Sequence, residues 1–351
     1  MISTSPAIGL ALFGISESDC RTEPASDGYI NDTFKVWMGE KPRYILQRIS
    51  ATVFGDGVGL MKNVALVLPH LKAQDYSELK LIATPNASKW AHDSEGNAWR
   101  MYEFIEGSHT ISTSASVKVA QEAGRIIGKF HLLLAPINPS ELHLTLPRFH
   151  DLNWRSEQLE TAINTGISQR IAEAHPWIVI ALELIATCLD IPWEKLPVRV
   201  CHNDTKLSNI LFNSAAEEAL CLIDLDTIMP GYFLYDVGDA VRTITNPLTE
   251  DHRNWEEISL NLALFRPFMS GIKQSGLHLN PHEIETLHIG PILLPLLHGI
   301  RALSDYLLGD VYYKISYPDQ NMVRARSLLR VAQLTAIRMD ELQKICQEEL
   351  A

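Results

Sequence analysis

The first hundred residues contain short runs in which apolar and polar positions alternate, which is the period of β-strands. Two such runs, Tyr29–Trp37 and Arg43–Ile49, are separated by a turn at 38–41, and together they predict an antiparallel hairpin. A further strand is predicted at Trp99–Ile105, and the helical spacing of apolar residues over Leu60–Leu71 predicts a helix.

After Gly107 the apolar positions follow the period of helices. Helices are predicted over 117–134, 154–190, 254–272, 282–308 and 321–349. Within this helical part, short apolar runs predict strands at 198–201, 210–212 and 219–224. We therefore expect an α+β protein of two lobes, with a small β-rich N-terminal lobe over residues 1–105 and a larger, mainly helical C-terminal lobe over residues 106–351.

Composition and charge narrow the range of partners. The formal net charge is −12, from 42 acidic and 30 basic residues, so nucleic acid and anionic membranes would be repelled and neither is expected as a partner.

No stretch of the sequence is expected to contain the eighteen or so consecutive apolar residues of a membrane span. The apolar run Ala7–Ile15 follows no basic residue and is expected to pack on the N-terminal lobe rather than to act as a secretory signal. The five cysteines lack C-x-x-C spacing and fit reduced thiols, so we expect a cytoplasmic protein.

The most informative segments are His202–Asn209, His-Asn-Asp-Thr-Lys-Leu-Ser-Asn, and the later run Leu220–Asp226, Leu-Cys-Leu-Ile-Asp-Leu-Asp. Phosphoryl transfer from a nucleotide uses one carboxylate to receive a hydroxyl proton, with an amide and a second carboxylate to hold Mg²⁺. The order H-x-D-x-x-x-x-N, followed by an apolar strand that carries Asp, supplies all three groups. The sequence therefore predicts a small-molecule kinase that uses ATP and Mg²⁺.

Asp204 is the candidate base, on a loop between buried strands where a substrate hydroxyl could approach. Lys206, two residues later, could reach the transferring phosphoryl group, or it could be a solvated lysine. His202 is expected to brace the loop through backbone hydrogen bonds. Asn209 and Asp224 offer the hard oxygen donors that Mg²⁺ prefers. Asp226 could be a second ligand or could stabilise the turn after the strand.

Residues that could contact the nucleotide are spread over the N-terminal lobe. The turn at the start of the hairpin could bring Asn31 or Thr33 over the phosphates, although an ordinary β-turn would look the same. Gln47 and Arg48 point to opposite faces of their strand, so only one of them can face the phosphates, and the sequence does not decide which.

The segment 103–106 is expected to connect the two lobes. The backbone of Glu103 and Ile105 would pair with the edge of the adenine. A simple buried edge strand is the alternative interpretation.

Taken together, these residues resemble the aminoglycoside phosphotransferase superfamily, which has a protein-kinase-like fold, and within it the N-acetylhexosamine 1-kinases. The resemblance extends over nearly the whole chain and is carried by the segments 28–34, 44–49, 202–209, 222–231, 235–242 and 299–315.

The resemblance implies that Asp204 is the base, that Asn209 and Asp224 bind Mg²⁺, and that a sugar pocket lies in the helical lobe. It also implies that Arg301 and Tyr312 contact the sugar; without it they would be interpreted as a surface arginine and a core tyrosine. Asp236 and Asp239 resemble the acidic motif of the superfamily and are expected to cap helices and brace the loop.

Two positions depart from the family pattern. Tyr29, which we expect to contact the substrate, stands where sugar 1-kinases often carry His. The predicted helix at 60–71 contains Lys62 but no acidic residue, so the Lys–Glu pair of protein kinases has no evident counterpart. Either Gln47 or Arg48 serves the phosphates without an acidic partner, or another residue supplies the pair.

The leading hypothesis is an ATP- and Mg²⁺-dependent kinase that phosphorylates the anomeric hydroxyl of an N-acetylhexosamine or a related sugar. One alternative keeps the fold but changes the acceptor to an aminoglycoside, choline, homoserine or thioribose, and the charge of −12 does not exclude a cationic acceptor. The other alternative, a non-catalytic nucleotide-binding pseudokinase, is disfavoured because Asp204, Asn209 and Asp224 are all present. The oligomeric state does not follow from the sequence.

Overall fold

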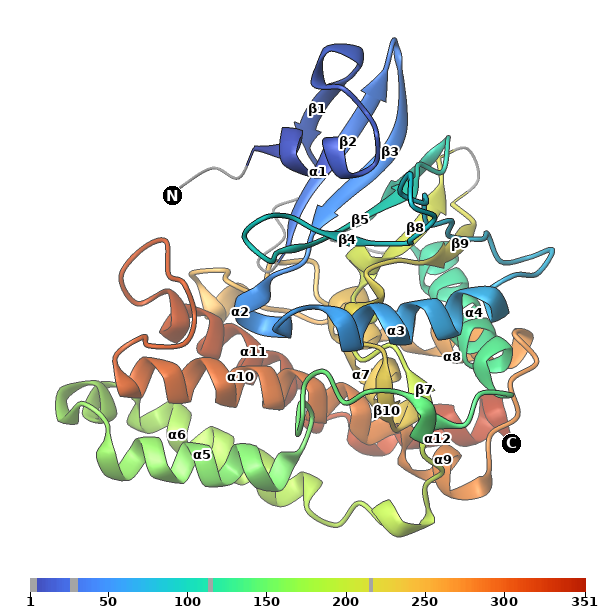
Figure 1. Cartoon of the computed structure of the whole chain (residues 1–351). Helices are drawn as coiled ribbons and strands as arrows, with labels where there is room; N and C mark the ends of the chain where they lie inside the picture. Colours follow the sequence, from blue (N-terminus) through green and yellow to red (C-terminus); the bar gives the residue numbers. More distant parts are fainter. Residues whose placement is uncertain (1–4, 26–30, 113–115, 215–216) are drawn as a thin grey trace.

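The computed structural model of the chain describes residues 5–25, 31–112, 116–214 and 217–351. A β-sheet at the N-terminal end lies against a mainly helical C-terminal part, as the predicted fold class requires (Figure 1). The sheet is antiparallel and has the strand order β1-β2-β3-β5-β4. Its strands are β1 (Arg21–Pro24), β2 (Asp32–Met38), β3 (Lys41–Arg48), β4 (Ala91–His92) and β5 (Ala98–Glu103).

The predicted hairpin is formed by β2 and β3, which pair antiparallel around Gly39. Gly39 has a φ of 62°, a backbone conformation that residues with a side chain rarely adopt. Because side chains alternate along a strand, the two faces of the sheet carry different residues. The strand pairing therefore determines which residues of β3 and β5 share a face.

One face of the sheet packs on the N-terminal helix α1 (Pro6–Leu12) and forms a small separate core around Leu46 and Trp99. A side chain at Gly9 of α1 would lie 2.3 Å from the Trp99 ring, so this contact requires glycine. The opposite face, which includes Ile45 and Tyr102, joins the main core of the protein. The N-terminal apolar run thus packs on the N-terminal lobe, as predicted, and it does so as a helix.

Two helices, α2 (Ala51–Phe54) and α3 (Val58–Val67), lie between β3 and β4 in the chain, and α3 runs between the sheet and the helical part (Figure 1). The side chain of Asn63 on α3 donates hydrogen bonds to the carbonyl groups of His143 (2.8 Å) and Ile228 (3.0 Å). The predicted helix over 60–71 ends earlier than expected because residues 68–70, which include Pro69, form a short 3₁₀ turn.

The C-terminal part contains long helices packed around α7 and α10. These helices are α4 (Val117–Leu134), α5 (Leu152–Thr165), α6 (Ser168–Cys188), α7 (Phe233–Thr245), α8 (Phe265–Gln274), α9 (Pro281–Thr286), α10 (Gly290–Leu308), α11 (Gln320–Ala336) and α12 (Met339–Leu350). The prediction of a helix over 254–272 was wrong for its first half. Residues 254–264 contain two short 3₁₀ turns instead. The backbone N–H of Asn261, between these turns, donates to the carbonyl of Thr245 at 2.9 Å.

Two small sheets hold the segments that carry the kinase-like motifs. One joins β7 (Arg199–Cys201) and β10 (Met229–Gly231), and the other joins β6 (Ser108–Thr110), β8 (Ile210–Asn213) and β9 (Ala219–Leu222). Residues 202–209 connect β7 to β8, and residues 223–228 connect β9 to β10. The two loops are therefore anchored at both ends by strand pairing.

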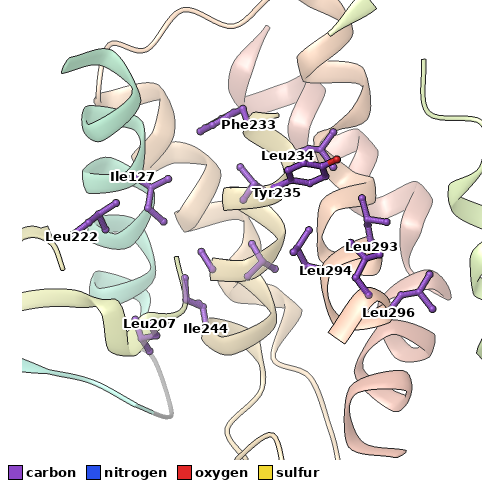
Figure 2. Packing of buried hydrophobic residues seen from close by; sticks show 14 of the residues in the cluster. Ile127, Leu207, Leu222, Phe233, Leu234, Tyr235, Ile244, Leu293, Leu294 and Leu296 are labelled. Atoms are coloured by element: carbon purple, nitrogen blue, oxygen red, sulfur yellow. The ribbon is translucent and has the colours of Figure 1, made fainter. Parts of the chain in front are cut away.

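The centre of the helical part is α7, whose apolar side chains pack between those of α4 and α10 (Figure 2). The backbones of α7 and α10 come into direct contact where they cross. A Cβ atom on Gly238 would lie 2.1 Å from the carbonyl oxygen of Gly290, and one on Gly290 would lie 2.4 Å from that of Leu234. Neither position can accept a larger residue without a movement of the helices.

Two helical segments reach the length and hydropathy of a membrane span, Ser168–Cys188 and Pro281–Leu308, so the expectation that no segment would do so was wrong. In the second segment, 83% of the most apolar stretch is buried inside the protein, as is typical of a core helix. The first segment packs on α10 and α11 and is 39% buried. This composition is weak evidence for a membrane, and the absence of a membrane partner stays a prediction.

Candidate functional site

The loop between β7 and β8 is held by a buried carboxylate at the start of α7. Asp236 is fully buried and accepts hydrogen bonds from the backbone N–H groups of His202 (2.9 Å) and Asn203 (2.7 Å). Asn203 has a φ of 63°, and its side chain donates to the carbonyl of Thr227 at 3.0 Å. The position of the following residue, Asp204, is therefore fixed by its neighbours in the loop, and Asp236 acts as the predicted brace.

His202 also braces this loop, as the sequence suggested. It is fully buried, and its Nε2 donates to the carbonyl of Ile223 at 2.9 Å, which ties the loop to the end of β9. Its Nδ1 accepts the backbone N–H of Asp204 at 3.3 Å. Both ring nitrogens are thus occupied by backbone groups.

The side chains of Asp204, Lys206 and Asn209 meet in one place. Oδ2 of Asp204 accepts hydrogen bonds from Nζ of Lys206 (2.9 Å) and from Nδ2 of Asn209 (2.8 Å). Burial disfavours the charge on Lys206, but the nearby carboxylates of Asp204 and Asp224 raise its pKa, so the amine is protonated. The side chain of Asp204 is 23% exposed, which leaves it accessible to a substrate.

Asp224 follows β9 and differs from the other carboxylates of the site. Its φ of 62° and ψ of 57° place it in the left-handed region, which Asp and Asn tolerate better than most residues. Its carboxylate makes no hydrogen bond or ion pair with the described residues. Burial and the charges of Asp226 and Asp204 raise its pKa to about 6.

This environment fits a divalent cation. Three carboxylates lie near one another, and the one without a partner, Asp224, is the one with a raised pKa. A hard cation would neutralise this charge, and the side-chain oxygen of Asn209 is a suitable second donor.

Asp226 forms an ion pair with Arg100 on β5, and both side chains are almost completely buried. The predicted alternatives for Asp226 were a metal ligand or a turn residue; the structure adds a third role as the partner of a buried cation. Nε of Arg100 donates to Oε1 of Gln47 at 2.9 Å, and the two residues are directly opposite in the β3–β5 pairing. Arg100 was missed by our sequence analysis, although a charged residue within the apolar run Trp99–Tyr102 was a signal that could have identified it.

Other predicted residues converge on the same ion pair. The side chain of Asn31 donates to Oδ2 of Asp226 at 2.5 Å, and Nε2 of Gln47 donates to Oγ1 of Thr33 at 3.1 Å. Arg48 points to the opposite face of the sheet, where its Nε bonds to Asp32 at 2.8 Å.

The structure therefore directs Gln47, rather than Arg48, toward Asp226. Tyr29 lies outside the described residues.

The segment after β5 has backbone groups available for a ligand. No backbone hydrogen bond from the Ile105 N–H is present in the described ranges, and the Glu103 carbonyl accepts none outside the strand pairing. The Glu103 side chain is exposed and lies 3.6 Å from Lys80. A backbone donor and a backbone acceptor two residues apart match what an adenine edge requires.

Arg301 and Tyr312 lie in a second cluster, on α10 and in the loop that follows it. The guanidinium of Arg301 is 5.1 Å from the ring centre of Phe149 and 5.8 Å from that of Tyr313. Tyr312 is 67% exposed, so it is not a core tyrosine, and its ring packs edge-on against Tyr313. The carboxylate of Asp305 accepts the N–H groups of Tyr312 (2.7 Å) and Tyr313 (2.9 Å), which fixes the shape of this loop.

The second cluster is connected to the first through His150. Its Nε2 donates to the carbonyl of Asn203 at 3.1 Å, and its sequence neighbour is Phe149, on which Arg301 packs. His298, one turn before Arg301 on α10, lies 3.6 Å from Asp239, whose carboxylate also bonds to Arg242 at 2.7 Å. The Arg301 cluster thus lies next to the loop that carries Asp204.

Comparisons with known proteins identify the family and the fold. The model of a phosphotransferase enzyme family matches residues 21–257. Three similar solved structures are a microcompartment-associated aminopropanol kinase, an aminoglycoside phosphotransferase from Alicyclobacillus acidocaldarius and a choline kinase from Cryptosporidium parvum.

The aminopropanol kinase is 16% identical, with a TM-score of 0.64 over 98% of this chain and 97% of that one. The aminoglycoside phosphotransferase is 14% identical, with a TM-score of 0.63 over 99% and 98%. The choline kinase is 13% identical, with a TM-score of 0.56 over 95% and 94%. At these identities the similarity concerns the fold, and it confirms the predicted kinase-like architecture.

Proposed function

The chain belongs to the phosphotransferase enzyme family, and from this premise we propose that it transfers the γ-phosphoryl group of ATP to the anomeric hydroxyl of an N-acetylhexosamine or a closely related sugar. The observation that supports a kinase most strongly is the shared position of Asp204, Lys206 and Asn209, with Asp224 close enough to interact electrostatically. A non-catalytic role is disfavoured because each group that phosphoryl transfer uses is present.

The nucleotide would lie between the sheet and the loops 202–209 and 223–228. Asn209 and Asp224 would hold Mg²⁺, which supplies neutralisation of the phosphate charge when it is bound. Arg100 is the cation on the sheet side, kept in place by Asp226 and Gln47. The Arg100–Asp226 pair would take the place of the Lys–Glu pair of protein kinases, and its cation would come from β5 instead of β3.

The adenine would pair with the backbone of the segment after β5. The free N–H of Ile105 would donate to a ring nitrogen, and the carbonyl of Glu103 would accept from the exocyclic amine. Because these are backbone groups, substitution of either side chain should have little effect on nucleotide affinity.

In the chemical step, Asp204 would accept the proton of the acceptor hydroxyl as its oxygen attacks the γ-phosphorus and the bond to ADP breaks. The hydrogen bonds from Lys206 and Asn209 orient the Asp204 carboxylate. An anomeric hydroxyl is more acidic than an ordinary alcohol, so a positioned carboxylate is sufficient and no covalent intermediate with the enzyme is required.

The proposed sugar rests on the resemblance of segment 299–315, with Arg301 and Tyr312, to the N-acetylhexosamine 1-kinases. Arg301 can donate two parallel hydrogen bonds to oxygen acceptors, and Tyr312 offers an accessible aromatic ring. Arg301 packs on Phe149, whose sequence neighbour His150 bonds to the loop that carries Asp204, and this proximity supports a role for Arg301 in acceptor binding.

The proposal is tested by measuring sugar-dependent release of ADP with N-acetylglucosamine, N-acetylgalactosamine and a panel of other alcohols. NMR of the product should show phosphate on the anomeric carbon. Absence of turnover with every N-acetylhexosamine, together with turnover of another alcohol, would exclude the proposed acceptor but keep the enzyme class. Unchanged activity in Asp204→Asn would refute the assigned base.

A further inference from the structure

The protein surface around Arg301 carries positive charge that is not neutralised. Within residues 116–214 and 217–351, the Arg301 guanidinium makes contacts with the rings of Phe149 and Tyr313 but no hydrogen bond or ion pair. The two rings leave the edge of the guanidinium, which carries its N–H donors, free to bind a ligand. Arg301 is only half-buried, so a ligand can reach it.

A second arginine, Arg155 on α5, adds to this charge. It donates to Oε1 of Gln158 at 2.7 Å and more weakly to the carbonyl of Phe149 at 3.4 Å, and it has no carboxylate partner among the described residues. Its Nε is buried without a hydrogen-bond partner. Burial and repulsion by Arg301 lower the pKa of Arg155 to about 10, so the Arg155 guanidinium stays charged at neutral pH.

Several acids of the surrounding elements already have partners of their own. Asp305 accepts two backbone N–H groups and the side chain of Asn321 at 2.8 Å. Glu250 interacts with Arg242 and Arg324, and Arg242 also pairs with Asp239.

Asp151, four residues before Arg155, caps α5 by accepting the N–H of Trp154 at 3.0 Å. None of these acids offers an unpartnered carboxylate to a cationic ligand.

From this arrangement we infer that the acceptor site selects neutral or anionic sugars and rejects acceptors that carry an ammonium group, an inference that rests on the proposed function. A carbonyl or carboxylate oxygen would accept the paired N–H groups of Arg301, whereas an ammonium group in the same position would be repelled by Arg301 and Arg155. A site for polycationic acceptors requires the opposite arrangement, with free carboxylates along the acceptor wall.

The sharpest test compares N-acetylglucosamine with glucosamine, which lacks the acetyl group and carries a protonated amine in place of the uncharged amide. We expect kcat/KM at neutral pH to be at least tenfold higher for N-acetylglucosamine. The difference should decrease at a pH above the pKa of the glucosamine amine, because the repulsion then disappears while the size of the substrate stays the same. A preference that does not change with pH would overturn the inference.

Variants identify the source of the selectivity. Arg301→Gln and Arg155→Gln should each reduce the preference for N-acetylglucosamine, and Arg301→Glu should reverse it in favour of glucosamine. Arg253→Gln is the matched control, because the exposed Arg253 also lies over a tyrosine ring, that of Tyr317 at 4.6 Å, and its removal should leave the ratio unchanged. The ATP-induced rise in melting temperature shows whether each variant is folded.

The outcomes separate this inference from the proposed function. Equal turnover of the two sugars by the wild type would refute charge selection and leave the sugar kinase proposal intact. If neither sugar reacts but choline or an aminopropanol does, both proposals are wrong. If only other neutral or anionic alcohols react, the sugar assignment is wrong and charge selection is supported.

Discussion

Replacement of Asp224 by Asn is expected to abolish activity and yet stabilise the protein in the absence of nucleotide and metal. Asp224 has no partner among the described residues, and burial and two neighbouring acids raise its pKa from the ordinary 3.8 to about 6. Asn has nearly the same shape and tolerates the left-handed backbone at this position, where φ is 62°. The substitution therefore removes the charge without imposing a new backbone conformation.

The size of the effect follows from the pKa. A difference of about two pKa units corresponds to about 3 kcal/mol at about 1.4 kcal/mol per unit. Because Asp224 is only partly buried, solvent screening reduces this to about 1–2 kcal/mol. A chain of this length has an unfolding entropy of about 0.7 kcal/mol/K, so the melting temperature should rise by about 1–3 °C.

The sign of the pH dependence is fixed by the direction of the pKa change. The folded protein holds a proton on Asp224 more tightly than the unfolded chain, so the ionised carboxylate destabilises the fold at pH values above about 6. Below the ordinary value of 3.8 the carboxyl group is protonated in both states and the penalty vanishes. The gain in melting temperature from Asp224→Asn should therefore be complete near pH 7 and decline toward zero near pH 4.

The measurement is thermal unfolding of wild type and Asp224→Asn at several pH values, with and without Mg²⁺ and a non-hydrolysable ATP analogue. The wild type should gain stability from the ligands, and the variant should gain much less. Asp226→Asn is the control, two residues away, and should destabilise the protein because Arg100 would be left buried without its partner. A lower melting temperature for Asp224→Asn at pH 7, or a gain that does not change with pH, would refute the argument.

Three further predictions concern the catalytic loop, the buried ion pair and the helix crossing. Asp204→Asn should lower kcat about 10²–10⁴-fold with an unchanged Kd for ATP, measured by ADP release and nucleotide titration; a change confined to Kd would contradict the role of base. Arg100→Met should reduce the free energy of unfolding by about 3–5 kcal/mol in chemical denaturation, because the Asp226 carboxylate would be buried and unpaired; a change below about 1 kcal/mol would mean that water reaches the pair. Gly238→Ala should cost about 1–3 kcal/mol in the same assay because its methyl group would meet the backbone of α10, whereas Gly96→Ala, where a Cβ atom meets nothing within 4 Å, should not create a steric clash of this kind.

The sequence predicted well those features that depend on residues close together in the chain. The hairpin of β2 and β3 follows from two alternating runs and a tight turn, and α4 was predicted with the bounds that it has. Asp204, Lys206 and Asn209 meet because one short loop between two strands carries all three. Local spacing was sufficient for these features.

Features that depend on contacts between distant segments were not predicted. The Arg100–Asp226 pair joins β5 to a loop more than a hundred residues later, and only the packing of the sheet on the helical part brings the two residues together. The choice between Gln47 and Arg48 depends on which face of the sheet α1 covers, and alternation along one strand does not contain that information. The backbone N–H of Asn261 likewise bonds to the distant carbonyl of Thr245, in a segment that apolar periodicity alone had assigned to a helix.

The contact between the backbones of α7 and α10 at Gly238 and Gly290 has a consequence for how this enzyme could acquire new substrates. Helix α7 anchors the loop that bears Asp204, and α10 bears Arg301, so the main-chain contact sets the spacing between the residues that we propose as proton acceptor and as sugar contact. Side chains on the loop after α10 can therefore mutate without shifting the carboxylate of Asp204. Diversification of acceptors should proceed through such exchanges, while the two glycines remain constant.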